Sequence, residues 1–265
     1  MENLRKYDFQ IGGKYFESGT HIMGILNATP DSFFSASRVG ESAVKRAKEM
    51  LASGAEVLDI GGQSTRPNSE PVSALEEMSR VLPVVEAIRA ECPDALISVD
   101  TYYPEVAEAV IAAGVHMIND VSCLEYTDLA RVIAEGGVSV CVMHNRRKSK
   151  IADMFLDKEI GLSAAIKKLE KAGVDKNKIL LDGGIGFNKS KDEDWQLLND
   201  YDKLIDYFDE YPLLLGTSRK SMFGGEPEMR LTATLDSTAL AVKQGVLFVR
   251  VHDVKENKAV IDALR

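Results

Sequence analysis

The sequence has little cysteine, and nothing in it predicts disulfides or a bound zinc ion. Its 265 residues include three cysteines, Cys92, Cys123 and Cys141. Their number is odd, no Cys-x-x-Cys occurs, and neither a His-Glu-x-x-His motif nor a Cys/His cluster is present. Reduced thiols in a cytoplasmic protein fit this usage better than a disulfide framework. A tight zinc site is not expected.

Long apolar runs and flexible linkers are also missing. No apolar run approaches the ~20 residues that a membrane-spanning helix needs. The first seventeen residues contain no apolar segment typical of a signal peptide, so we expect neither feature. No stretch rich in Pro, Gly and Ser divides the chain, which predicts a single domain over residues 1–265.

Positive charge is in deficit. Lys and Arg number 32 against 41 Asp and Glu, so the formal net charge is −9. Such a chain is a poor candidate for broad binding to nucleic acid or to an anionic membrane. Local basic clusters can still bind a small anion. Hydrophobic residues make up 45% of the chain, which is enough for a sizeable core.

Nucleotide-binding glycine motifs are absent, and a regular alternation of short and long segments takes their place. No Gly-x-Gly-x-x-Gly opens a helix after the first strand, and no Gly-x-x-x-x-Gly-Lys-Ser/Thr occurs. The sequence around Gly12-Gly13 alternates apolar and polar residues, which predicts a short hairpin over 8–17 with a two-residue turn. Beyond it, eight short β-branched runs alternate with amphipathic stretches. At this length, the pattern favours an α/β fold of the (β/α)8 TIM barrel type, with a doubly wound open sheet as the alternative.

The expected elements follow from the periodicity of apolar residues. Strands are predicted at 22–26, 57–60, 95–99, 115–118, 138–143, 179–181, 213–215 and 246–251. Helices are predicted at 42–53, 74–91, 104–114, 128–135, 158–172, 194–208, 230–244 and 255–264. Pro83 lies inside the second of these helices and predicts a kink or a junction there.

Polar side chains follow every predicted strand. The strand ends read Asn27-Ala-Thr-Pro-Asp31, Gly61-Gly-Gln-Ser-Thr65-Arg66, Asp100-Thr101, Asn119-Asp120, His144-Asn145, Asp182-Gly-Gly-Ile-Gly-Phe187, Gly216-Thr-Ser-Arg219-Lys220-Ser221 and Arg250-Val-His252-Asp253. In a barrel all eight ends meet on one face, where active sites form. The sequence therefore predicts an active site there.

These residues form two groups of different chemistry. Carboxylates and an amide with one ammonium can bind the N–H and carbonyl edge of a heterocycle: Asp100, Asn119, Asp182 and Lys220. Basic side chains with an amide can bind phosphates: Arg66, Arg219, Arg250, His252 and Asn27. The turn at 218–221 leads into a helical region, whose backbone N–H groups could hold a carboxylate. Asp59, inside the second strand, is left outside the predicted site.

The strand-end motifs resemble those of the dihydropteroate synthase family. They are Gly24–Phe33, Asp59–Pro67, Ile97–Thr101, Ile118–Val121, Val142–His144, Asp182–Phe187, Ser218–Ser221 and Arg250–Val254, and they follow in the order of the family from about Met23 to Val254. The resemblance implies a TIM-barrel transferase that joins 6-hydroxymethyl-7,8-dihydropterin diphosphate to 4-aminobenzoate and releases pyrophosphate. It also implies Mg2+, a homodimer and a sulfonamide target.

The resemblance assigns roles to individual residues. The pterin would be held by Asp100, Asn119, Asp182 and Lys220. The diphosphate would be held by Asn27, Arg66, Arg250 and His252, with Asn27 also at the metal. The 4-aminobenzoate would be framed by Thr65, Arg66, Phe187, Lys220 and Ser221, and Asp31 lies on the first loop. The catalytic group would be Asp100, Asp182, Lys220, Arg250 and His252.

Some positions depart from the pattern, and two other functions share part of it. Gly183 stands where the family often has Pro, which predicts a looser loop. One alternative is a methyltetrahydrofolate methyltransferase that uses a corrinoid, and the basic residues that could hold a diphosphate argue against it. The other is a paralogue that binds pterin without condensing it, and the intact set of strand-end residues argues against that.

Overall fold

The computed structural model describes residues 5–28, 36–63, 72–145 and 153–265. Parallel strands follow one another in chain order around a closed barrel, and the last pairs with the first. They are β3 (His21–Asn27), β4 (Val57–Gly61), β5 (Ile97–Asp100), β6 (Met117–Asp120), β7 (Ser139–Met143), β8 (Ile179–Asp182), β9 (Leu213–Leu215) and β10 (Phe248–Val251). The predicted (β/α)8 barrel is thus confirmed, and the open sheet is excluded.

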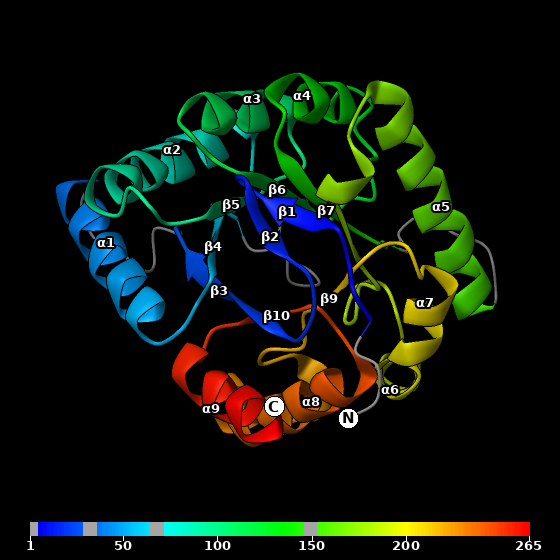
Figure 1. The fold of residues 1–265 in the computed structure, drawn as a ribbon. Coiled ribbons are helices and arrows are strands. Elements are labelled where there is room, and N and C mark those ends of the chain that lie inside the picture. Colours follow the sequence, from blue (N-terminus) through cyan, green and yellow to red (C-terminus); the bar gives the residue numbers. More distant parts are fainter. Residues whose placement is uncertain (1–4, 29–35, 64–71, 146–152) are drawn as a thin grey trace.

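Helices surround the barrel (Figure 1). They are α1 (Ala36–Ala52), α2 (Ala74–Glu91), α3 (Pro104–Ala112), α4 (Leu129–Gly136), α5 (Met154–Ala172), α6 (Lys191–Asn199), α7 (Tyr201–Tyr207), α8 (Leu231–Gln244) and α9 (Val254–Leu264). Short 3-10 turns lie at η2 (Lys176–Lys178), η3 (Ser221–Phe223) and η4 (Pro227–Arg230). Apolar side chains of the helices pack on the outside of the strands and form the main core.

Local signals explain most helix boundaries. The Ser73 side chain accepts the Glu76 N–H at the start of α2, and Pro104 occupies the first turn of α3. Pro83 lies inside a continuous α2, so the predicted junction is wrong. The single helix predicted at 194–208 is also wrong, because Asp200 has non-helical dihedral angles (φ −106°, ψ 24°) and separates α6 from α7.

The predicted amino-terminal hairpin is present, and it covers one end of the barrel. β1 (Phe9–Ile11) and β2 (Lys14–Phe16) are antiparallel and joined at Gly12-Gly13, and the hairpin crosses the near end of the barrel in Figure 1. Phe9 and Phe16 are buried against Phe248 of β10, with ring centroids 6.1 and 4.9 Å away. These aromatic contacts close the amino end of the barrel.

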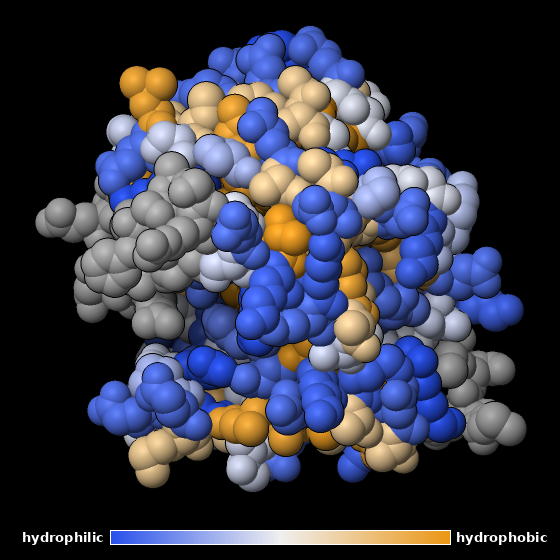
Figure 2. All heavy atoms as spheres, turned by 90° about the vertical axis from the view of Figure 1, so that its left-hand side faces the viewer, coloured by the Kyte–Doolittle hydropathy of each residue, from blue (hydrophilic) through white to orange (hydrophobic). Residues whose placement is uncertain are grey.

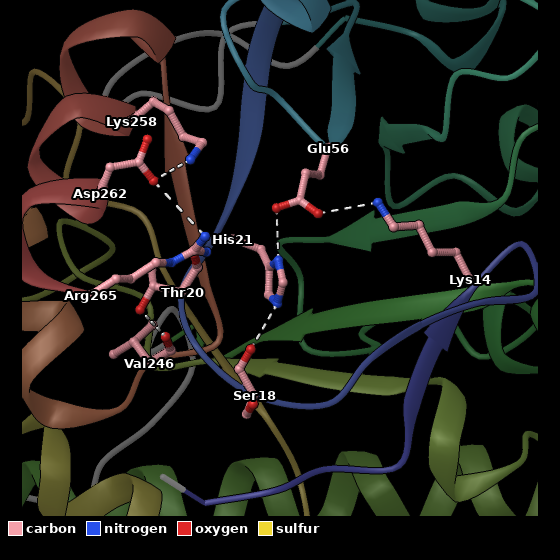
Figure 3. A network of polar contacts seen from close by, with 9 residues as sticks. All are labelled: Lys14, Ser18, Thr20, His21, Glu56, Val246, Lys258, Asp262 and Arg265. Carbon is pink, nitrogen blue, oxygen red and sulfur yellow. Dashed lines mark hydrogen bonds and ion pairs between the residues drawn. The ribbon is translucent and has the colours of Figure 1, made fainter. Parts of the chain in front are cut away.

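Polar contacts fasten this closed end (Figure 3). His21 Nδ1 lies 2.7 Å from Glu56 Oε1, and Nε2 lies 3.1 Å from the Ser18 carbonyl oxygen. Lys14 Nζ of β2 donates to Glu56 Oε2 at 3.1 Å. Burial alone would raise the pKa of Glu56, but hydrogen bonds and charge from His21 and Lys14 outweigh it and lower this pKa to about 2. Glu56 thus links the hairpin to the barrel.

The surface around α1 is mostly hydrophilic, with apolar side chains interspersed (Figure 2). Among the described residues, no helix combines the length and the apolar composition that crossing a membrane requires. Cys92, Cys123 and Cys141 are all free thiols, which agrees with the predicted absence of disulfides.

Candidate active site

The carboxyl ends of three strands bring together three buried polar side chains. Asp100 ends β5, Asn119 lies in β6 and Asp182 ends β8, and they are 4%, 3% and 8% exposed. Asp100 and Asn119 are direct partners in the β5–β6 pairing. The prediction that these residues meet inside one rim of the barrel is therefore confirmed. Such groups are costly to bury unless partners or a ligand satisfy them.

Arg250 joins two of the strand ends from across the barrel. Its Nε donates to Asp59 Oδ2 at 2.6 Å, and its Nη2 donates to Asp100 Oδ2 at 3.0 Å. Asn119 Nδ2 donates to the same Asp59 oxygen at 3.1 Å. Asp59, which was left outside the predicted site, therefore contacts two of its residues. A carboxylate inside a fully buried strand was the available signal, because such groups require partners.

Burial shifts the ionisation of this cluster. It raises the pKa of Asp100, and the Arg250 guanidinium opposes the shift. It also raises the pKa of Asp182, against the Gly184 N–H and Lys220. Burial lowers the pKa of Lys220 to about 8, while the negative charge of Asp182 acts in the other direction. The site therefore contains groups whose charge a ligand can readily change.

Lys220 lies beside an aromatic ring at the mouth of the site. Its Nζ donates to the Ile185 carbonyl at 2.9 Å and lies 4.2 Å from the centroid of the Phe187 ring. Phe187 is half-buried and packs on a small apolar cluster that includes Tyr102. Ser221 follows Lys220 as the first residue of η3 and is exposed. Lys220 thus lies next to Phe187 in space and next to Ser221 in the chain.

The loop after β8 is held by backbone N–H donors. Gly183 N donates to the Tyr201 hydroxyl oxygen at 2.9 Å, and Gly184 N donates to Asp182 Oδ1 at 2.8 Å. The Tyr201 hydroxyl in turn donates to the Leu214 carbonyl at 2.6 Å. A proline at 183 would lack the N–H that Tyr201 accepts. The hydrogen bond from the Gly183 N–H to Tyr201 therefore anchors this loop, although glycine at this position predicts a looser loop.

The two basic residues near the last strand differ in their surroundings. His252 follows β10, and its Nδ1 lies 2.9 Å from Ser218 Oγ. Arg219 was expected in the anion site, but its Nε and Nη2 donate to the Asp253 carboxylate at 3.0 and 2.6 Å. This bidentate pair holds Arg219 against Asp253, so its place in the anion group stays a prediction.

The remaining predicted residues lie at or after the ends of the first two barrel strands in the sequence. Asn27 is exposed at the end of β3. Asp31, Thr65 and Arg66 lie outside the described residues. Across the described ranges, no three His, Cys, Asp or Glu side chains are grouped so as to hold a metal ion. An exposed amide oxygen still suits Mg2+, which commonly keeps several waters and binds few protein ligands together with substrate phosphates.

Comparisons with known proteins agree over nearly the whole chain. The family model described as pterin binding enzyme matches residues 23–252. The dihydropteroate synthase of Clostridium beijerinckii is 42% identical over 258 residues, which cover 94% of this chain and 95% of that protein. The Escherichia coli dihydropteroate synthase is 40% identical over 273 residues, covering 95% and 94%.

Solved structures give the same result. The Clostridium difficile dihydropteroate synthase, crystallised in the presence of pteroic acid, superposes with a TM-score of 0.89 at 39% identity and covers 97% of each chain. The Xanthomonas albilineans enzyme with 4-aminobenzoic acid has a TM-score of 0.89 at 35% identity and covers 98% of this chain and 97% of that one.

Proposed function

Because this chain belongs to the family of pterin-binding enzymes that are dihydropteroate synthases, we propose a role for each strand end in that reaction. The enzyme joins 6-hydroxymethyl-7,8-dihydropterin diphosphate to 4-aminobenzoate and releases pyrophosphate. Its reaction therefore needs three subsites, for a flat heterocycle, for an anion and for an aromatic amine.

The pterin is assigned to the buried cluster of Asp100, Asn119 and Asp182, together with Lys220. The observation that carries this assignment is Asp100 Oδ1, a buried carboxylate oxygen without a hydrogen-bond partner among the described residues. An oxygen in that state costs free energy, and an N–H of the pterin ring would satisfy it. Carboxylates and an amide on one rim match the donors of that ring.

The diphosphate is assigned to Arg250 and His252, with Arg66 and Asn27 from the first two strand ends. Arg250 binds Asp59 and Asp100 through Nε and Nη2, and Nη1 makes no hydrogen bond to the described residues. This nitrogen is therefore the one assigned to a phosphate oxygen. The Asn27 amide oxygen would be a ligand of Mg2+. When bound, Mg2+ would neutralise charge on the diphosphate.

The 4-aminobenzoate is assigned to the mouth, between Phe187 and Lys220. The Phe187 ring offers an aromatic face, and the neighbouring Lys220 ammonium favours a bound anion. Ser221 would take the carboxylate, and Thr65 and Arg66 would frame the ring from the second strand end. The amine then faces the pterin methylene from the side opposite the leaving diphosphate.

The bond between the methylene carbon and the diphosphate oxygen breaks, and its electron pair leaves with the diphosphate. Arg250 and His252 stabilise the charge that develops on that oxygen. Asp100 and Asp182 stabilise the positive charge on the pterin side. The neutral amine attacks the methylene and afterwards loses a proton to solvent, so no general base is required before attack.

Assembly and location are further parts of the proposal. We place the enzyme in the cytoplasm as a homodimer. Trp195 of α6 and Met229 of η4 are exposed apolar side chains, at 39% and 77%, and they are candidates for the contact between subunits. Light scattering coupled to size exclusion tests this. Sulfonamide binding is proposed because the Yersinia pestis enzyme has been solved with a sulfonamide drug.

Asp100→Asn and Asp182→Asn test the site. Each is isosteric and removes one carboxylate, so the fold should survive while formation of dihydropteroate falls by orders of magnitude. The assay combines the pterin diphosphate, labelled 4-aminobenzoate and Mg2+. Asp120→Asn is the matched control, because Asp120 is equally buried but accepts from Ser122 and Leu124 in its own loop. Near wild-type turnover of Asp100→Asn or Asp182→Asn would contradict the assignment.

A further inference from the structure

Asp59 lies beneath the proposed pterin subsite and contacts two of its residues. It is fully buried in the middle of β4, two residues before the strand ends at Gly61. Its Oδ2 accepts Arg250 Nε at 2.6 Å and Asn119 Nδ2 at 3.1 Å. Two donors from different strands, β10 and β6, thus converge on one carboxylate oxygen.

The contact with Asn119 fixes which end of that amide faces the ligand. A carboxylate paired with a guanidinium can only accept hydrogen bonds, so Asn119 must turn its NH2 group towards Asp59. The carbonyl oxygen of Asn119 is then directed away from Asp59. If the Asn119 amide were flipped, its NH2 group would face the ligand in place of the carbonyl oxygen. Two donors would then meet, and the N–H groups of a pterin could not bind there.

The contact with Arg250 fixes the guanidinium in the same way. A guanidinium presents its donors in a rigid planar fork, so two bound nitrogens define the plane and direction of the third. Here Nε is held by Asp59 and Nη2 by Asp100. Without Asp59, Arg250 would retain the Asp100 contact alone and could rotate about it.

We propose that Asp59 is a positioning residue, which orients the Asn119 amide towards the pterin and the Arg250 guanidinium towards the diphosphate. The inference rests on the proposed assignment of Asn119 and Asp100 to the pterin. Asp59 is assigned no contact with the substrate and acts through these two neighbours.

The test compares two ligands that each report on one part of the site. The first probe is 6-hydroxymethyl-7,8-dihydropterin, which lacks the diphosphate, and the second is inorganic pyrophosphate with Mg2+. Calorimetry would measure their dissociation constants on the full chain. Asp59→Asn is isosteric but offers only a neutral acceptor, so we expect affinity for the pterin alcohol to fall about tenfold. Affinity for pyrophosphate should fall less, by about threefold, because Arg250 keeps its charge and its contact with Asp100.

Asp120→Asn is the matched control, since it alters an equally buried carboxylate one residue from Asn119. It should reduce the melting temperature without a selective loss of the pterin alcohol. Asp59→Ala removes the acceptor altogether and should weaken pterin binding more than Asp59→Asn does. If Asp59→Ala fails to fold, the comparison of Asp59→Asn with Asp120→Asn decides. Wild-type pterin affinity in Asp59→Asn, or an equal loss in Asp120→Asn, overturns the inference.

Asp100→Asn separates this inference from the assignment on which it rests. If Asp100→Asn loses the pterin alcohol and Asp59→Asn does not, the positioning role alone is wrong. If Asp100→Asn binds the pterin alcohol like the wild type, the pterin assignment is wrong, and the role of Asp59 falls with it.

Discussion

Lys220 Nζ lies 4.2 Å from the centroid of the Phe187 ring, so an ammonium and an aromatic face form one wall of the site. Burial lowers the pKa of this lysine to about 8, although Asp182 opposes that shift. The wall is therefore cationic at neutral pH and loses its charge within the range in which enzymes can be assayed.

The pKa of Lys220 predicts that activity falls at alkaline pH, which gives the pH profile an alkaline limb. Lys220 is charged below about pH 8 and neutral above it, so kcat/KM should fall as the pH rises through about 8. Lys220→Arg keeps its charge at every pH used and should remove this limb, even if its overall activity is lower. Rates of the wild type and of Lys220→Arg, measured from about pH 6.5 to about pH 9.5, would show whether the alkaline fall is present. An identical alkaline limb in Lys220→Arg would assign the titration to another group.

Arg219 and Arg250 should differ in their effect on anion binding. Arg250→Ala should weaken the pterin diphosphate by about tenfold or more, because it removes a cation from the proposed diphosphate subsite. Arg219→Ala should leave that affinity nearly unchanged, since the guanidinium is paired with Asp253. Equilibrium binding in the presence of Mg2+ makes the comparison. If both variants lost comparable affinity for the pterin diphosphate, Arg219 would belong to the anion site as well.

Gly184 should tolerate no side chain. Its φ is +69°, and a Cβ there would lie 2.0 Å from the His144 carbonyl oxygen, which is backbone and cannot move aside. Gly184→Ala should therefore reduce the free energy of unfolding by roughly 3 kcal/mol or more. Gly137→Ala, at φ +64° with open space around the new Cβ, should cost only about 1 kcal/mol. Denaturant titration of the two variants measures the difference, and equal costs would contradict it.

The Glu56 contacts predict how stability depends on pH. The pKa of Glu56 is lowered to about 2 in the folded chain, so its contribution is complete above the unfolded value and is lost as the pH falls through about 2. Glu56→Gln should reduce the free energy of unfolding on the order of 2 kcal/mol at pH 7. The difference in the free energy of unfolding between Glu56→Gln and the wild type should disappear towards pH 2. Glu49→Gln, which alters an exposed carboxylate 3.6 Å from Arg46, should change little at any pH.

Much of the barrel and part of the site could be predicted from the sequence. Buried parallel strands appear as short apolar runs, and a polar residue where a run stops marks the active rim, as for Asp100, Asn119 and Asp182. Arg219 and Arg250 cannot be separated in this way, because each follows an apolar run. Only the fold reveals that Asp253 engages the first and Asp59 the second.

Contacts between distant segments were beyond the reach of local patterns. The Gly183 N–H meets the Tyr201 hydroxyl across 18 positions of the chain. Tyr201 is fully buried in α7, but periodicity cannot show that its hydroxyl also anchors the loop after β8. The break at Asp200 was missed for a similar reason, because apolar residues continue at helical spacing on both sides of it.

The hairpin packed against Phe248 covers the amino end of the barrel. In the proposed arrangement both substrates bind at the carboxyl ends of the strands, the pterin at the buried cluster and the 4-aminobenzoate above it at the mouth. The ligand at the mouth must then leave before the ligand beneath it can leave. A ligand bound between Phe187 and Lys220 should therefore lengthen the residence of the pterin beneath it, and Lys220 is assigned to both ligands.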